Sequence, residues 1–162
     1  MRRNASSRNS PTAGAGDTRR GGKGRGGLMP AILFASARLL REWSSCDPLL
    51  QEVTLWMVEH AWDPVQMGPI RITSIYRTKD ENQAAGGKTE VHCQRPHRAL
   101  DVGGAGLTQE TIKLTGFAVN SEYQYDSERP SKVVAYSEPH GTGPHLHLQI
   151  HPNTKRVHGD DV

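Results

Sequence analysis

The chain has 162 residues and a formal net charge of +3, and 35% of its residues are hydrophobic. This length suits a single domain that can bury a core without disulfides or structural metals. No apolar run reaches about 18 residues, so we expect no membrane-spanning helix. The two cysteines, Cys46 and Cys93, define no disulfide framework, and the sequence leaves open whether they pair.

The start of the chain differs in composition from the remainder. Residues 1–27 are rich in Gly, Ser and Arg and hold seven of the 20 basic residues but one of the 17 acidic ones. Such a segment buries too little apolar surface to offset the entropy of ordering, so we expect a disordered Arg/Gly-rich tail over residues 1–28. A nucleic-acid-binding arm is one interpretation of the tail, and a true start at Met29 is the other. The positive charge is not followed by a hydrophobic segment, so we expect no secretory signal.

From Met29 onward the hydrophobic pattern is typical of a folded domain, which we expect to cover residues 29–155 and to end in a flexible stretch at 156–162. Apolar residues at helical spacing predict three helices, over residues 30–43, 48–62 and 108–123. Thr108 is expected to be the N-cap of the third helix. In the second helix His60 lies on the apolar stripe, so we expect it to be a buried packing residue.

Alternating apolar and β-branched residues predict the strands of a sheet. The expected strands cover residues 70–77, 98–104, 132–137 and 145–151. Between the first two, the stretch "KDENQAAGGK" predicts a loop or short helix that ends in a Gly-Gly turn. This order of elements indicates an α+β domain with a small, mainly antiparallel sheet packed with helices.

The last strand, in the stretch "GPHLHLQIH", places histidines and apolar residues on opposite faces. His145, His147 and His151 share one face, and Leu146, Leu148 and Ile150 share the other. The apolar face is expected to contact the core, which leaves the histidine face for a polar network or a metal ion. Two imidazoles about 7 Å apart along a strand can reach one ion, or one can bind the ion while the other acts on water.

An earlier segment, "EVHCQRPHRALDVGG", supplies further candidate ligands: His92, His97 and Asp101. One of these histidines, the aspartate and a histidine of the last strand make two imidazoles and one carboxylate. That set is typical of a catalytic zinc site with an open fourth position. The residues alone leave open which histidine of the segment takes part.

These segments together resemble the M15 family of zinc peptidases, the D-alanyl-D-alanine carboxypeptidase and bacteriophage endolysin group with the Hedgehog/DD-peptidase fold. The resemblance runs in order over residues 70–151. The matching positions are Ser74, Tyr76, Arg77, Asn82, Gly86, Gly87, His92, Ala99, Asp101, His145 and His147. It implies a zinc-dependent peptidase that acts on peptidoglycan stem peptides.

Carried over by position, the resemblance implies that His92, Asp101 and His147 bind Zn²⁺. It also implies that Arg77 holds a substrate carboxylate or the developing oxyanion. Eight residues separate His92 from Asp101 where the family usually has six, so His97 is the alternative ligand. An H-x-x-x-D spacing followed by HxH also resembles the M23 lysostaphin-like zinc endopeptidases, whose longer Gly-rich stretch between the motifs is not found here.

The general base is the second departure from the family pattern. Many M15 enzymes have an acidic residue three positions before the last zinc histidine, and this chain has Pro144 there. His145 is the nearest substitute along the strand, so we expect it to act as the base. Glu138 and His140 are further substitutes that require their loop to fold back.

The expected function is therefore that of a monomeric DD-carboxypeptidase or LD-endopeptidase from a phage or prophage, made in the host cytoplasm and acting on the cell wall after release. The alternative is a non-catalytic, zinc-stabilised cell-wall-binding or virion structural module on the same fold. A third interpretation, nucleic-acid binding through residues 1–27, predicts salt-sensitive binding that is lost with the tail.

Overall fold

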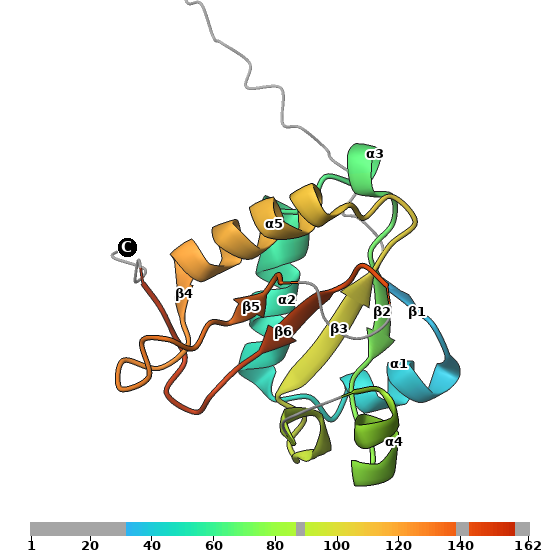
Figure 1. Ribbon diagram of the computed structural model, residues 1–162, viewed down its shortest axis with the longest axis vertical. Helices are drawn as coiled ribbons and strands as arrows, with labels where there is room; N and C mark the ends of the chain where they lie inside the picture. The colour runs from blue at the N-terminus through green and yellow to red at the C-terminus, as the bar shows by residue number, and fades with distance from the viewer. Residues whose placement is uncertain (1–31, 87–89, 139–142, 158–162) are drawn as a thin grey trace, which may run out of the picture.

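The computed structural model describes residues 32–86, 90–138 and 143–157, so the expected disordered tail at 1–28 lies outside the described residues. A five-stranded sheet in the order β1-β2-β3-β6-β5 forms its centre (Figure 1). The strands are β1 (Leu33–Phe34), β2 (Arg71–Ser74), β3 (Ala99–Gly103), β5 (Ala135–Tyr136) and β6 (Leu146–Gln149). β1 is parallel to β2 and the other pairs are antiparallel. The expected α+β class with a mainly antiparallel sheet is confirmed.

The helices begin at side-chain caps. They are α1 (Ala37–Trp43), α2 (Pro48–His60), α3 (Pro64–Met67), α4 (Lys79–Ala84) and α5 (Gln109–Glu122), with a 3₁₀ turn η1 at Val91–Cys93. Their caps are Ser36, Asp47, Asp63, Thr78 and Thr108, so the expected cap of α5 is confirmed. None of the described helices is long and apolar enough to cross a membrane.

The first helix is shorter than its apolar pattern predicts. The prediction of a helix over 30–43 is wrong at its start, because Leu33 and Phe34 pair with β2 as strand β1. Ser36 then accepts a hydrogen bond from the backbone N–H of Leu39, which starts α1 at Ala37. Short apolar runs fit both periodicities, so pairing partners decide between them.

The sheet has one apolar and one polar face. On the apolar face the register aligns Ile72 with Val102 and Leu146, and Leu100 with Leu148. These side chains belong to the main core, which α2 and α5 complete (Figure 1). Burying this face drives the folding of the domain and fixes the register of the central strands, because a one-residue slip would expose every core side chain.

A bulge in β2 breaks the simple alternation that predicted a strand over 70–77. The register shifts between Ile72 and Ser74, and Ile75, three residues after Ile72, is again fully buried. Ser74 is thereby placed opposite Asp101 of β3. Bulges of this kind re-aim side chains next to functional sites.

Two further expectations concern His60 and the C-terminal stretch of the chain. His60 is exposed rather than buried, because it is the last residue of α2, where its ring stacks on Trp56 with 5.0 Å between centroids. Of the flexible stretch expected at 156–162, residues 158–162 lie outside the described residues, and Arg156 belongs to β7 (Lys155–Arg156), which pairs with β4 (Tyr123–Gln124). Arg156 also forms an ion pair of 2.7 Å with Glu122.

The two cysteines are free thiols with different surroundings. Cys46 is buried and Cys93 is partly exposed. Burial raises the pKa of the Cys46 thiol to about 12, with smaller contributions from the charges of Glu42 and Asp47. Thiolates are the reactive species, so Cys46 is protected both by its protonation and by its burial.

We expect a thiol reagent at pH 8 to modify Cys93 at least about tenfold faster than Cys46 in the folded protein. Peptide mapping by mass spectrometry after short labelling times measures both rates. In denaturant both residues are expected to react at similar rates. Equal rates in the folded state would contradict the burial of Cys46.

Candidate metal centre

The two central strands bring Asp101 and His147 together on the polar face of the sheet. The antiparallel register of β3 and β6 places these residues directly opposite each other. Both are buried, with exposed fractions of 3% for Asp101 and 9% for His147. The Nδ1 atom of His147 lies 2.8 Å from Oδ1 of Asp101. Ser74 of β2 and Tyr136 of β5 extend this polar row across four strands.

The third member, His92, comes from the η1 turn that contacts β3. Its Nδ1 atom lies 2.7 Å from the carbonyl oxygen of Ile75. A carbonyl oxygen only accepts, so Nδ1 carries the proton and Nε2 of the neutral ring carries the lone pair. Nε2 lies 3.2 Å from Nδ1 of His147 and 3.4 Å from Oδ1 of Asp101. The Ile75 carbonyl therefore fixes the ring orientation of His92, as hydrogen-bond acceptors do for metal-binding histidines.

These three residues form a group that can hold a metal ion. One potential ligand atom from each lies within 4.8 Å of the other two, and all three residues are buried. The hydrogen bond to Asp101 requires a proton on Nδ1 of His147, and a bound cation would replace that proton. Two imidazoles and one carboxylate are a ligand set found in catalytic zinc sites.

The electrostatics of the group favour an ionised aspartate. Burial by itself raises the pKa of Asp101, but the hydrogen bond from His147 and the nearness of the His92 ring outweigh it and hold the pKa far below the usual range. The side chain is therefore a carboxylate at neutral pH. A carboxylate is the form that a metal site requires.

Arg77 contacts the same aspartate from the other side. Its guanidinium forms an ion pair with Oδ2 of Asp101, which leaves Oδ1 directed at the two histidines. The backbone N–H of Arg77 also donates to the carbonyl of His92 at 3.1 Å. Arg77 thus positions two members of the group, a role that the sequence did not indicate.

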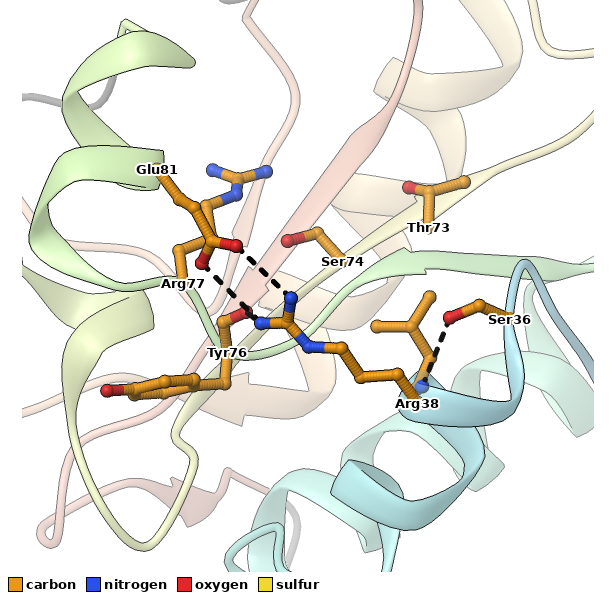
Figure 2. A pocket seen from close by; sticks show the side chains of 8 residues that line it. Ser36, Arg38, Thr73, Ser74, Tyr76, Arg77 and Glu81 are labelled. Atoms are coloured by element: carbon orange, nitrogen blue, oxygen red, sulfur yellow. Dashed lines mark hydrogen bonds and ion pairs between the residues drawn. The ribbon is translucent and has the colours of Figure 1, made fainter.

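A cavity of about 280 Å³ borders the Arg77 side of the group. Its polar lining consists of Ser36, Thr73, Ser74, Tyr76, Arg38, Arg77 and Glu81. In Figure 2, Arg38 extends from α1 to the carboxylate of Glu81, to which it donates at 3.1 Å. This ion pair links α1 to α4, and the link holds the two walls of the cavity together.

The remaining candidates lie outside the group. His97 is buried, but its Nδ1 atom lies 3.1 Å from the carbonyl of Gln94 and its ring packs against Tyr76. Its backbone bonds to Ser45 and Asp47, and His97 is not a member of the group of potential ligands. Of the two candidates in that segment, the structure thus brings His92 to Asp101 and His147.

The candidate bases are placed differently from one another. His145 immediately precedes β6, is partly exposed, and its Nδ1 atom lies 3.0 Å from the carbonyl of Gly143. Glu138 is exposed, and His140 lies outside the described residues. His151 does not share the site, because the chain leaves β6 after Gln149 and brings His151 to within 3.3 Å of Asp126.

The chain was compared with known protein families, curated proteins and solved structures. The chain matches no family model, no curated protein and no solved structure with which it was compared.

Proposed function

We propose that the protein is a zinc-dependent peptidase that hydrolyses peptide bonds in peptidoglycan stem peptides, with the Hedgehog/DD-peptidase fold. The observation that carries the proposal is the buried group of His92, Asp101 and His147, whose potential ligand atoms lie within 4.8 Å of one another. The motif resemblance supplies the substrate class. A phage-type lysin that reaches the cell wall after release is part of the same proposal.

The donor set supports zinc over the hard cations. Two imidazole nitrogens and one carboxylate oxygen suit Zn²⁺, whereas Ca²⁺ and Mg²⁺ prefer oxygen ligands throughout. Zinc bound by His92, Asp101 and His147 would supply Lewis acidity for amide hydrolysis. The three residues leave a fourth position, as catalytic rather than structural zinc sites do.

His145 is the proposed general base. Its Nδ1–H donates to the carbonyl of Gly143, so in the neutral ring Nε2 is the nitrogen that can accept a proton. His145 immediately precedes β6, two residues before His147 along the chain, and this spacing puts side chains on one face of an extended chain. Histidine is the side chain that most often serves as a general acid or base near neutral pH.

The test incubates zinc-loaded protein with purified peptidoglycan and with synthetic stem peptides. The released amines are measured as the product of hydrolysis. His145→Gln is expected to lower turnover by about 10²- to 10⁴-fold and to leave the zinc content unchanged. His60→Gln, an exposed histidine at the end of α2, is the matched control and is expected to retain full turnover.

The alternative function is a non-catalytic wall-binding or virion module that keeps zinc for stability, and Pro144 at the usual acidic position favours it. If the zinc-loaded wild type releases no amine under conditions where a known peptidase does, the proposal of an enzyme is overturned. The non-catalytic module is then the supported function. Turnover that His145→Gln leaves unchanged would overturn the assignment of the base.

A further inference from the structure

A second cavity, of about 420 Å³, lies where β3 begins and β6 ends. Four separate segments contribute to its wall: the η1 segment, the residue before β3, the end of β6, and the chain that follows β4. Its polar lining includes Glu90, Gln94, Arg98, Arg129, Lys132 and Gln149. A volume of this size is in the range of small-ligand sites.

This cavity is next to the candidate metal centre. Gln149 follows His147 by two residues on the same face of β6, so the two side chains lie about 7 Å apart along the strand. The η1 segment carries His92 into the metal centre and Gln94 into the cavity. A ligand at the metal centre and a group in the cavity can therefore belong to one extended molecule.

The lining is rich in positive charge. Arg98, Arg129 and Lys132 line the cavity together with one acidic residue, Glu90, whose carboxylate is paired with Lys79 at 2.9 Å. Among the described residues Lys132 has no ion-pair partner. An unpaired cation in a concave site attracts an anionic group.

Both arginines keep hydrogen-bonding capacity for a ligand. Arg98 contacts Asp47 through Nε at 3.2 Å, and Arg129 contacts Asp126 through Nε at 3.5 Å. Within the described residues no other ion pair involves these guanidinium groups, so their terminal amino groups can donate elsewhere. Paired terminal N–H groups match the planar geometry of a carboxylate.

We propose that this cavity binds a carboxylate group of the peptide substrate, on a residue that flanks the cleaved bond, an inference that rests on the proposed function. The carboxylate is held by Arg98, Arg129 and Lys132, with Gln94 and Gln149 as neutral neighbours. The site thereby selects acidic over amidated peptides. No residue of the cavity takes part in the metal group itself.

The experiment compares two synthetic stem peptides that differ in one group, a free carboxylate against a carboxamide on the residue next to the cleaved bond. Wild type is expected to favour the acidic peptide by about tenfold in kcat/KM. Lys132→Met is expected to reduce this ratio by about threefold, and Lys132→Glu to abolish it. Lys113→Met, an exposed lysine on α5, is the matched control and is expected to keep the wild-type ratio.

Calorimetric binding of the same two peptides separates this inference from the proposed function. Tighter, Lys132-dependent binding of the acidic peptide without any turnover would support the cavity and overturn the peptidase. Turnover with equal kcat/KM for both peptides would overturn the proposal that the cavity binds a carboxylate, and the peptidase proposal would stand. Competition by inorganic phosphate as strong as that by the acidic peptide would overturn the assignment to carboxylate, because the site would then be a phosphate site.

Discussion

Purified protein is expected to hold one zinc ion per chain, and His92→Ala, Asp101→Ala or His147→Ala is expected to weaken zinc binding by more than about 100-fold. The physical reason is the closeness of three buried ligand atoms, all within 4.8 Å of one another. Elemental analysis gives the stoichiometry, and competition with a chromophoric chelator gives the affinity. Circular dichroism of each variant shows that the fold is retained.

Two controls make this measurement specific. His97→Ala removes the alternative candidate ligand and is expected to keep zinc, because Nδ1 of His97 is hydrogen-bonded to the Gln94 carbonyl in the wild type. His60→Ala removes an exposed histidine far along the chain from the group. Loss of zinc in a folded His97→Ala variant would contradict the assignment of His92. Wild type without affinity for zinc would remove the basis of the peptidase proposal.

Zinc is also expected to stabilise the fold, by an amount that rises with the logarithm of its concentration once that exceeds the Kd. A ligand that binds the native state alone adds about 4 kcal/mol to the free energy of unfolding at a thousand times its Kd. The variants that lose the ligand atoms are expected to lose this increment. The same samples therefore report on binding through a second property.

The elements that the sequence predicted well are those whose local signals agree with their packing. α5 has a polar cap at Thr108 followed by apolar residues at helical spacing, and its start was predicted to the residue. β6 has strict alternation of Leu and His, and its apolar residues do contact the core. Local pattern and tertiary burial specify the same conformation in both elements.

Predictions failed where a distant partner decides the conformation. Leu33 and Phe34 form a strand because β2 lies beside them, a contact that helical spacing cannot indicate. His60 lies on the apolar stripe of α2 but beyond the part of that stripe that the core covers. The bulge in β2 depends on pairing with Asp101, so its position has no signal in "IRITSIYR".

The candidate site was predictable in its residue types and not in its geometry. The spacing of His92, His97 and Asp101 left the choice of histidine open, and the structure groups His92 with Asp101 and His147. The carbonyl of Ile75, which orients His92, belongs to an apolar residue and carries no sequence signal. The ion pair of Arg77 with Asp101 likewise follows from tertiary structure.

The second large effect is expected for Arg77→Met, which removes the cation paired with Asp101. The side chain of Asp101 is 5% exposed and that of Arg77 is 22% exposed, so the variant leaves a carboxylate buried without this partner. Breaking one side of a buried pair lowers the free energy of unfolding by about 3–5 kcal/mol. Urea unfolding in the presence of a chelator measures this loss, and Arg71→Met, an exposed arginine of β2, is the matched control.

The same variant distinguishes a positioning role from simple stabilisation. Zinc places positive charge beside Asp101, so the loss caused by Arg77→Met is expected to be smaller with zinc than with chelator. Zinc affinity is expected to fall by about 10- to 100-fold, as for other residues that orient metal ligands. In an Asp101→Asn background, where no buried carboxylate remains, Arg77→Met is expected to change stability little. Equal losses with and without zinc, or in both backgrounds, would mean that Arg77 acts by packing and not through the charge of Asp101.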